Sequence, residues 1–273
     1  MIDEKVFLGY PINFKDICKV YPPTVDEVIS NDEFKIYHSL LTITQEEIED
    51  IYLKEQDNFS VENIQGPVEG VPFAVRMQLH QGKPKLDIPT PFQYLLINYH
   101  QGGEEIRELI FKAFLNFIHE PVTIVPEIKM LLIGKAEDEL DPDVDLEEPR
   151  LLTEENYFDF QNMIRTIMGE SNVERPDPDE DVNVKRVKRK NREGRRKAAE
   201  QKKPPTFGTL LTAICCMGIG LTPLNIGEMS YANVQWIIGM YQQNEEYNID
   251  IKALLAGADS KKVKPKYWIK NLD

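Results

Sequence analysis

Apolar residues recur along much of this 273-residue chain at the three- and four-residue spacing of an amphipathic helix, which predicts a mainly α-helical protein. Thr24 followed by Glu27 has the form of a capping box, in which each side chain bonds the other residue's backbone amide, and it predicts a helix over 24–41. Thr44 and Glu47 repeat this signature and predict a second helix directly after the first.

Two helices are predicted between Thr90, which is a helix cap, and Pro121, which ends the second of them. Gly102 and Gly103 separate the two, and the apolar residues of the second helix follow one face. The stretch that follows, residues 122–134, predicts one or two short strands, or a strand and a helical turn. Further helices are predicted over 153–169, 207–220, 222–229, 230–248 and 249–259.

The order of these segments predicts a two-part protein with a connecting linker. The first part is an acidic helical domain over 1–170, with a small β or loop insert at about 57–90, where glycines and prolines surround short apolar runs. An acidic loop over 137–148 belongs to the same domain. A charged linker over 171–205 then leads to a small helical domain over 206–273.

Charge is distributed unevenly along the chain, whose formal net charge is −14. Residues 1–184 carry 38 acidic and 15 basic side chains, whereas residues 185–203 carry eleven basic and two acidic ones. A basic strip of this kind binds phosphates without reading sequence, but it also attracts the acidic flanks beside it, and we favour the second interpretation. The candidate strip residues are Lys185, Arg186, Lys188, Arg189, Lys190, Arg192, Arg195, Arg196 and Lys197.

Features that would direct the chain to a membrane or an oxidising compartment are not recognised in the sequence. The amino terminus does not have the form of a signal peptide, and no apolar run is long enough to predict a membrane span. The three cysteines, Cys18, Cys215 and Cys216, form neither a metal-binding pattern nor a disulfide framework, which favours a reducing compartment.

The sequence offers no catalytic residue, cofactor site or metal site that we would assign. The four histidines, His38, His80, His100 and His119, are interpreted as structural, and no hydrolase or nucleotide-binding motif accompanies them. The spacing of the aspartates in 141–145 is similar to the start of a calcium loop. However, its sixth and twelfth positions are Leu146 and Leu152, where glycine and glutamate are needed.

Three stretches together resemble tailed-phage and prophage proteins of the tail module: 89–134, 151–165 and 211–273, with the basic strip between the last two. The nearest class is the long form of the tail assembly chaperone, in which a helical domain is joined by a linker to a C-terminal part. This resemblance implies a non-enzymatic protein of the host cytoplasm that binds the tape-measure protein, tail-tube subunits or both. It leaves open a structural protein of the virion, and the basic strip leaves open contact with nucleic acid.

A chaperone of this kind needs an apolar surface for its partner, and aromatic side chains are the candidates. They either line a binding groove or form the core of the protein, and we favour the core for those between 92 and 117. The candidates are Phe92, Tyr94, Tyr99, Phe111, Phe114, Phe117, Tyr231, Trp236, Tyr267 and Trp268. Association of the chain with itself is also left open.

Overall fold

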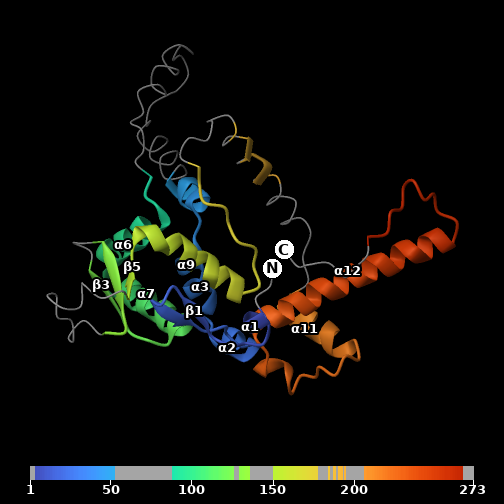
Figure 1. Ribbon diagram of the computed structural model, residues 1–273, viewed down its shortest axis with the longest axis horizontal. Coiled ribbons are helices and arrows are strands. Elements are labelled where there is room, and N and C mark those ends of the chain that lie inside the picture. The colour runs from blue at the N-terminus through green and yellow to red at the C-terminus, as the bar shows by residue number, and fades with distance from the viewer. Residues whose placement is uncertain are drawn as a thin grey trace, which may run out of the picture. The chain divides into compact units, whose positions relative to one another are not determined.

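The computed structural model describes residues 4–52, 88–125, 129–135, 150–177 and 206–266, together with residues 184, 187, 188, 190–192 and 194 (Figure 1). The predicted mainly α-helical fold is confirmed, and the described strands form a two-stranded and a three-stranded antiparallel sheet. The predicted insert at 57–90, apart from residues 88–90, lies outside the described residues. The predicted acidic loop at 137–148 also lies outside them.

The chain divides into two compact units whose boundaries differ from the predicted division. Unit 1 contains Met1–Lys35, Phe117–His119 and Asn162–Asp273, and unit 2 contains Ile36–Asn116 and Glu120–Gln161. The physical reason is a hydrophobic cluster that joins both ends of the sequence. In it Val25 packs with four buried residues of the C-terminal part, namely Ile214, Ile226, Val234 and Ile238. The helices after residue 206 therefore build their core with the first 35 residues.

Unit 1 begins with a short helix and a hairpin that the sequence pattern did not predict. Helix α1 (Glu4–Phe7) precedes strands β1 (Ile12–Phe14) and β2 (Cys18–Val20), which pair antiparallel with Ile12 opposite Val20. The turn between them places Lys15 and Asp16 at φ values of 47° and 58°. This left-handed conformation suits a tight hairpin but is usually signalled by glycine or asparagine, so the sequence gives little warning of it.

The predicted helix over 24–41 is interrupted, and two helices take its place. The capping box at Thr24 and Glu27 is confirmed and opens α2 (Val25–Ser30), with the Thr24 amide donating to Glu27 at 2.7 Å. Asn31 then ends α2 in an extended conformation and accepts the backbone amide of Glu33 at 3.0 Å. Such a local bond competes with helical hydrogen bonds, so α3 (Phe34–Thr42) starts anew.

Unit 2 is built around helices that pack through aromatic side chains. The predicted cap at Thr90 is confirmed and opens α6 (Pro91–Gln101), and α7 (Gly103–Ile118) follows after a break at Gly102. Helix α9 (Glu154–Ile167) supplies aromatic rings to both of them. The ring centres lie 5.0 Å apart for Phe92 and Tyr157 and 5.9 Å apart for Phe114 and Phe160. Burial raises the pKa of Tyr157, as expected for a core phenol.

A small sheet in unit 2 resolves the alternatives left open for residues 122–134. Strands β3 (Val122–Val125) and β4 (Met130–Ile133) pair antiparallel, and β5 (Leu151–Leu152) pairs with the other edge of β4. The stretch over 122–134 therefore contributes two strands, β3 and β4. The guanidinium group of Arg150 bonds the Glu120 carboxylate and lies where a side chain at Gly134 would project.

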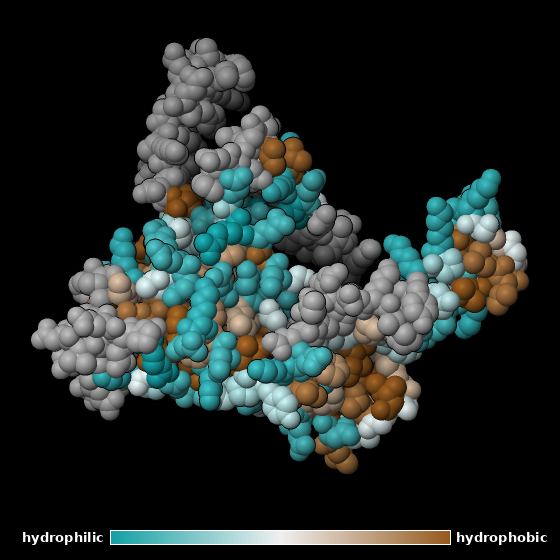
Figure 2. Space-filling view, in the orientation of Figure 1, coloured by the Kyte–Doolittle hydropathy of each residue, from teal (hydrophilic) through white to brown (hydrophobic). Residues whose placement is uncertain are grey.

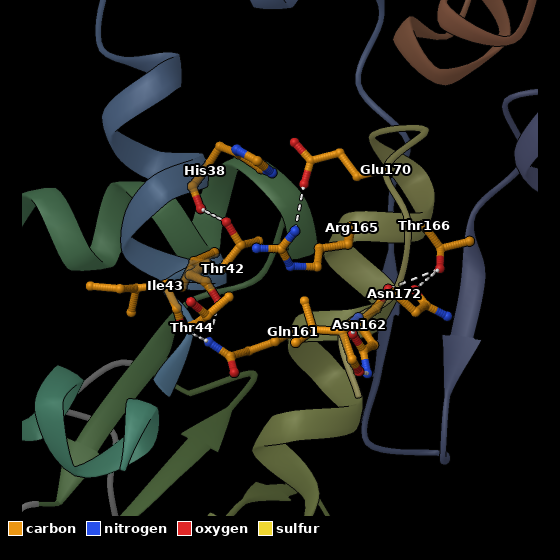
Figure 3. Close-up of polar contacts among 12 residues, drawn as sticks. His38, Thr42, Ile43, Thr44, Gln161, Asn162, Arg165, Thr166, Glu170 and Asn172 are labelled. Atoms are coloured by element: carbon orange, nitrogen blue, oxygen red, sulfur yellow. Dashed lines mark hydrogen bonds and ion pairs between the residues drawn. The ribbon is translucent and has the colours of Figure 1, made fainter. Parts of the chain in front are cut away.

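A buried glutamine closes the end of α3 in unit 2. The amide nitrogen of Gln161 donates to the backbone oxygens of Leu41 and Ile43, each at 3.0 Å (Figure 3). The last carbonyl groups of a helix have no partner within the helix, so this side chain satisfies acceptors that would otherwise be desolvated. The second capping box is confirmed as well, because Thr44 and Glu47 bond each other's backbone amides before the helical residues 45–52.

The helices predicted over 207–220 and 230–248 start where predicted but end elsewhere, and within the range predicted over 222–229 only a short 3-10 turn forms. Thr206 caps α11 (Phe207–Cys216), a 3-10 turn η3 (Ile226–Glu228) follows, and Ser230 caps α12 (Tyr231–Leu255). The helices predicted over 230–248 and 249–259 are one continuous helix, because no glycine, proline or local cap interrupts the backbone near Asn248. Among the described residues, no helix is long and apolar enough to cross a membrane.

Candidate partner-binding surfaces

The aromatic residues predicted in α6 and α7 mostly form the core of the protein. Phe92, Tyr99, Phe114 and Phe117 are buried. Of the other two candidates there, Tyr94 and Phe111 are half-buried, and Phe111 packs edge-on against Tyr99 with ring centres 5.7 Å apart. The four buried rings touch other core side chains and present no surface to a partner. The burial of these four residues agrees with the favoured interpretation as core and not with the alternative of a groove.

Two predicted aromatic residues lie at the start of α12 and remain partly accessible. Trp236 stacks on Phe7 with ring centres 6.1 Å apart, and Tyr231 packs against Phe207 at 5.0 Å. Burial raises the pKa of the Tyr231 phenol, a side-chain hydrogen bond with Gln235 lowers it, and the Glu170 carboxylate raises it. Both rings thus support the packing of unit 1 while keeping part of their surface available.

Most of the remaining candidates lie outside the described residues. Tyr267 and Trp268 lie outside the described residues, as do six strip residues: Lys185, Arg186, Arg189, Arg195, Arg196 and Lys197. Lys188 and Lys190 are helical and exposed, whereas Arg192 is half-buried. Two exposed lysines are compatible with contact to a polyanion, but they do not by themselves define an interface.

The predicted linker begins with residues that are held by the end of α9 within unit 1. The amide group of Asn162 donates to the backbone oxygen of Val173 at 3.1 Å and accepts its backbone amide at 2.9 Å. The Thr166 hydroxyl donates to Asn172, and Arg165 pairs with Glu170 at 3.1 Å (Figure 3). These bonds tie residues 170–173 to the helix, although the sequence pattern assigned residues 171–173 to the linker.

An apolar surface over α11 and the loop after it is the candidate site that sequence reasoning missed. Leu224 is 93% exposed and Ile219 is 53% exposed, and half-buried leucines of α11 and the loop adjoin the cluster beneath. We call Leu210, Leu211, Ile219, Leu221 and Leu224 the α11 surface. Figure 2 shows apolar side chains gathered over this part of the molecule.

The α11 surface is also uncharged. Residues 206–227 contain no aspartate, glutamate, lysine or arginine, although charged residues make up 29% of the whole chain. Depletion of charge together with exposed aliphatic side chains is typical of the centre of a protein–protein contact. This run without charge was a usable signal in the sequence, but helical periodicity alone does not tell which apolar residues the fold covers.

The described residues do not assemble a group with evident chemistry. His38 is half-buried and its backbone oxygen accepts the Thr42 hydroxyl at 2.7 Å, His100 is exposed, and His119 stacks on Tyr21 at 4.1 Å. His80 lies outside the described residues. Within the described ranges, no three histidine, cysteine, aspartate or glutamate side chains are placed to hold a metal ion.

Part of the chain is similar to a known protein family. Residues 197–273 match a protein family described as the YomV second domain, and this range covers all of the predicted C-terminal part at 206–273. No curated protein and no solved structure matches the chain. The matching family is phage-derived, so the match supports a phage or prophage origin for the chain, and it includes the whole α11 surface.

Proposed function

We propose that the chain is a non-enzymatic tail assembly chaperone of a phage or prophage, which binds the tape-measure protein, tail-tube subunits or both. The observation that carries the proposal is the uncharged α11 surface, with Leu224 93% exposed, within the segment that matches a phage-derived family. Exposed aliphatic side chains without charged neighbours in sequence are suited to contact with the apolar face of a partner helix.

The strongly acidic remainder of the chain fits this role. The net charge of −14 keeps a complex with a long amphipathic partner soluble, because like charges oppose the association of one complex with another. The α11 surface then supplies attraction and the acidic residues supply solubility. The two properties reside in different parts of the sequence, so they can be changed separately.

Co-expression tests the proposal. The chain is produced together with a long helical tape-measure protein, and the soluble fraction of that protein is measured. We expect the chain to raise the soluble fraction and Leu224→Asp to abolish the effect, because a carboxylate in the contact is costly to desolvate. Leu115→Asp is the matched control, since Leu115 is 52% exposed on α7 in unit 2. No change in solubility with the unaltered chain contradicts the proposal.

Two further candidate functions have their own tests. A structural virion protein is supported by the same phage-derived match, and mass spectrometry of purified particles distinguishes it, because a chaperone is expected to be absent from them. Contact with nucleic acid is supported by the exposed Lys188 and Lys190. Absence of a gel shift at low salt, where phosphate contacts are strongest, removes this candidate.

A further inference from the structure

The second half of α12 contains no buried residue. The buried residues of this 25-residue helix are Ala232, Val234 and Ile238, so residues 239–255 contain none. Leu255, its last residue, is 83% exposed, and Tyr241 is exposed as well. Figure 1 shows α12 running on past α11, and Figure 2 shows apolar side chains at its far end.

The same half of α12 carries the spacing of a coiled-coil seam. Alternating steps of three and four residues place one stripe along the helix: Val234, Ile237, Tyr241, Asn244, Asn248, Ile251 and Leu255. Met240, Tyr247 and Leu254 widen the stripe on one side, while Glu246 and Asp250 lie on the opposite face. The start of the stripe packs inside unit 1, where Val234 and Ile237 join the cluster with Ile214. The rest of the stripe contains no buried residue and is available to another helix.

The two asparagines indicate which helix fits. Asn248 donates its amide hydrogen to the side-chain oxygen of Asn244 at 3.4 Å, which leaves the amide nitrogen of Asn244 and the oxygen of Asn248 as a donor and an acceptor in the stripe. An aliphatic partner helix removes the hydrogen bonds that these groups make with water and offers no hydrogen bonds in their place. A second α12 offers the matching acceptor and donor at the same level.

We propose that two copies of this chain associate through antiparallel pairing of residues 239–255 of α12. One register aligns the uncovered part of the stripe with its copy. It sets Asn244 opposite Asn248 and Tyr241 opposite Ile251, and in the row beside the seam it brings Met240 close to Leu254 and Tyr247 close to its own copy. Antiparallel pairing is favoured because the start of the stripe is already occupied inside unit 1, and a parallel copy brings two such packed ends to the same point. This inference does not depend on the proposed chaperone function.

The mass of the chain in solution tests the association. Light scattering on the eluting protein is expected to give twice the 31.6 kDa of a single chain. The double variant Ile251→Asp and Leu255→Asp is expected to elute as a single chain with unchanged helical circular dichroism, because neither residue is buried within the chain. Its thermal transition is expected to fall only by the stabilisation that dimerisation provides. Ile249→Asp is the matched control: Ile249 is 60% exposed on α12 but lies off the stripe, so this variant stays a dimer.

Several outcomes overturn the proposal. It fails if the unaltered chain has the mass of a single copy, or if Ile249→Asp dissociates the dimer as strongly as the double variant does. A single-copy mass combined with a loss of helical circular dichroism in the double variant shows that the substitutions disrupt the fold of the chain itself, and this too contradicts the proposal.

Cysteine cross-linking tests the direction of pairing. In a Cys216→Ser background, Asn244→Cys and Asn248→Cys are made as separate proteins. Antiparallel pairing predicts oxidative cross-linking when the two proteins are mixed, and little within either one alone, because identical positions are then about one helical turn apart. Cross-linking within each single variant and none between them indicates parallel pairing and overturns the antiparallel arrangement.

Discussion

Helices α7 and α12 both carry apolar residues at helical spacing, but only α7 has its apolar face buried by other parts of the protein. Helix α7 has 16 residues, and its apolar stripe, which includes Phe114 and Phe117, is buried. Helix α12 has 25 residues and buries three of them, all before Gly239. Helical spacing identifies an apolar face in both cases, but only the three-dimensional packing shows whether the protein itself covers that face. The uncovered face is therefore the better guide to partners.

The largest expected effect on the free energy of unfolding comes from removing a buried side chain, in comparison with an exposed one. Phe114→Ala is expected to lower the free energy of unfolding by about 3–5 kcal/mol, because it removes a fully buried ring and leaves a cavity among Phe160 and its neighbours. Leu224→Ala is expected to change the same quantity by less than about 0.5 kcal/mol, since Leu224 is almost fully exposed. Urea unfolding measures both, and equal losses contradict the distinction between core and α11 surface.

An intermediate effect is expected at the buried amide that closes α3. Gln161→Leu removes the donor for the backbone oxygens of Leu41 and Ile43, and the desolvated acceptors are expected to cost about 1–3 kcal/mol of unfolding free energy. The control is Gln242→Leu on the exposed side of α12. If both substitutions have the same small effect, Gln161 does not stabilise the end of α3.

The smallest expected effect uses a glycine within α12. Gly239→Ala is expected to stabilise the chain by about 0.5–1 kcal/mol, because a Cβ atom at this helical position meets nothing within 4 Å and alanine lowers the entropy of the unfolded chain. Gly169→Ala is expected to destabilise it, since Gly169 has φ +73° and its Cβ would lie 3.2 Å from Ala232. Thermal unfolding compares the two, and a loss of stability for Gly239→Ala shows that something covers this point of α12.

The sequence predicted local features of the fold better than its long-range packing. Thr24, Thr44 and Thr90 mark helix starts correctly because a cap needs only residues close to it in the chain. The turn at Lys15 and Asp16 was missed because its left-handed backbone is not signalled by the usual residues.

Packing between distant parts of the chain was beyond reach of the sequence pattern. The predicted division placed Val25 and Ile214 in different domains, but they share one cluster, and nothing local to either residue indicates it. The candidate site was missed for the same reason: Leu224 and Phe114 are both apolar residues next to helical patterns, and only the cover provided by other elements distinguishes them. The uncharged run over 206–227 was the one signal available.

Hydrogen–deuterium exchange of the chain, alone and bound to the co-expressed tape-measure protein, tests the central claim most directly. The claim is that the α11 surface receives the partner, whereas the aromatic residues of α6 and α7 form the core. We predict that binding protects backbone amides over 207–227 and leaves those over 92–117 unchanged. Protection confined to 92–117, with no change at the α11 surface, contradicts the account.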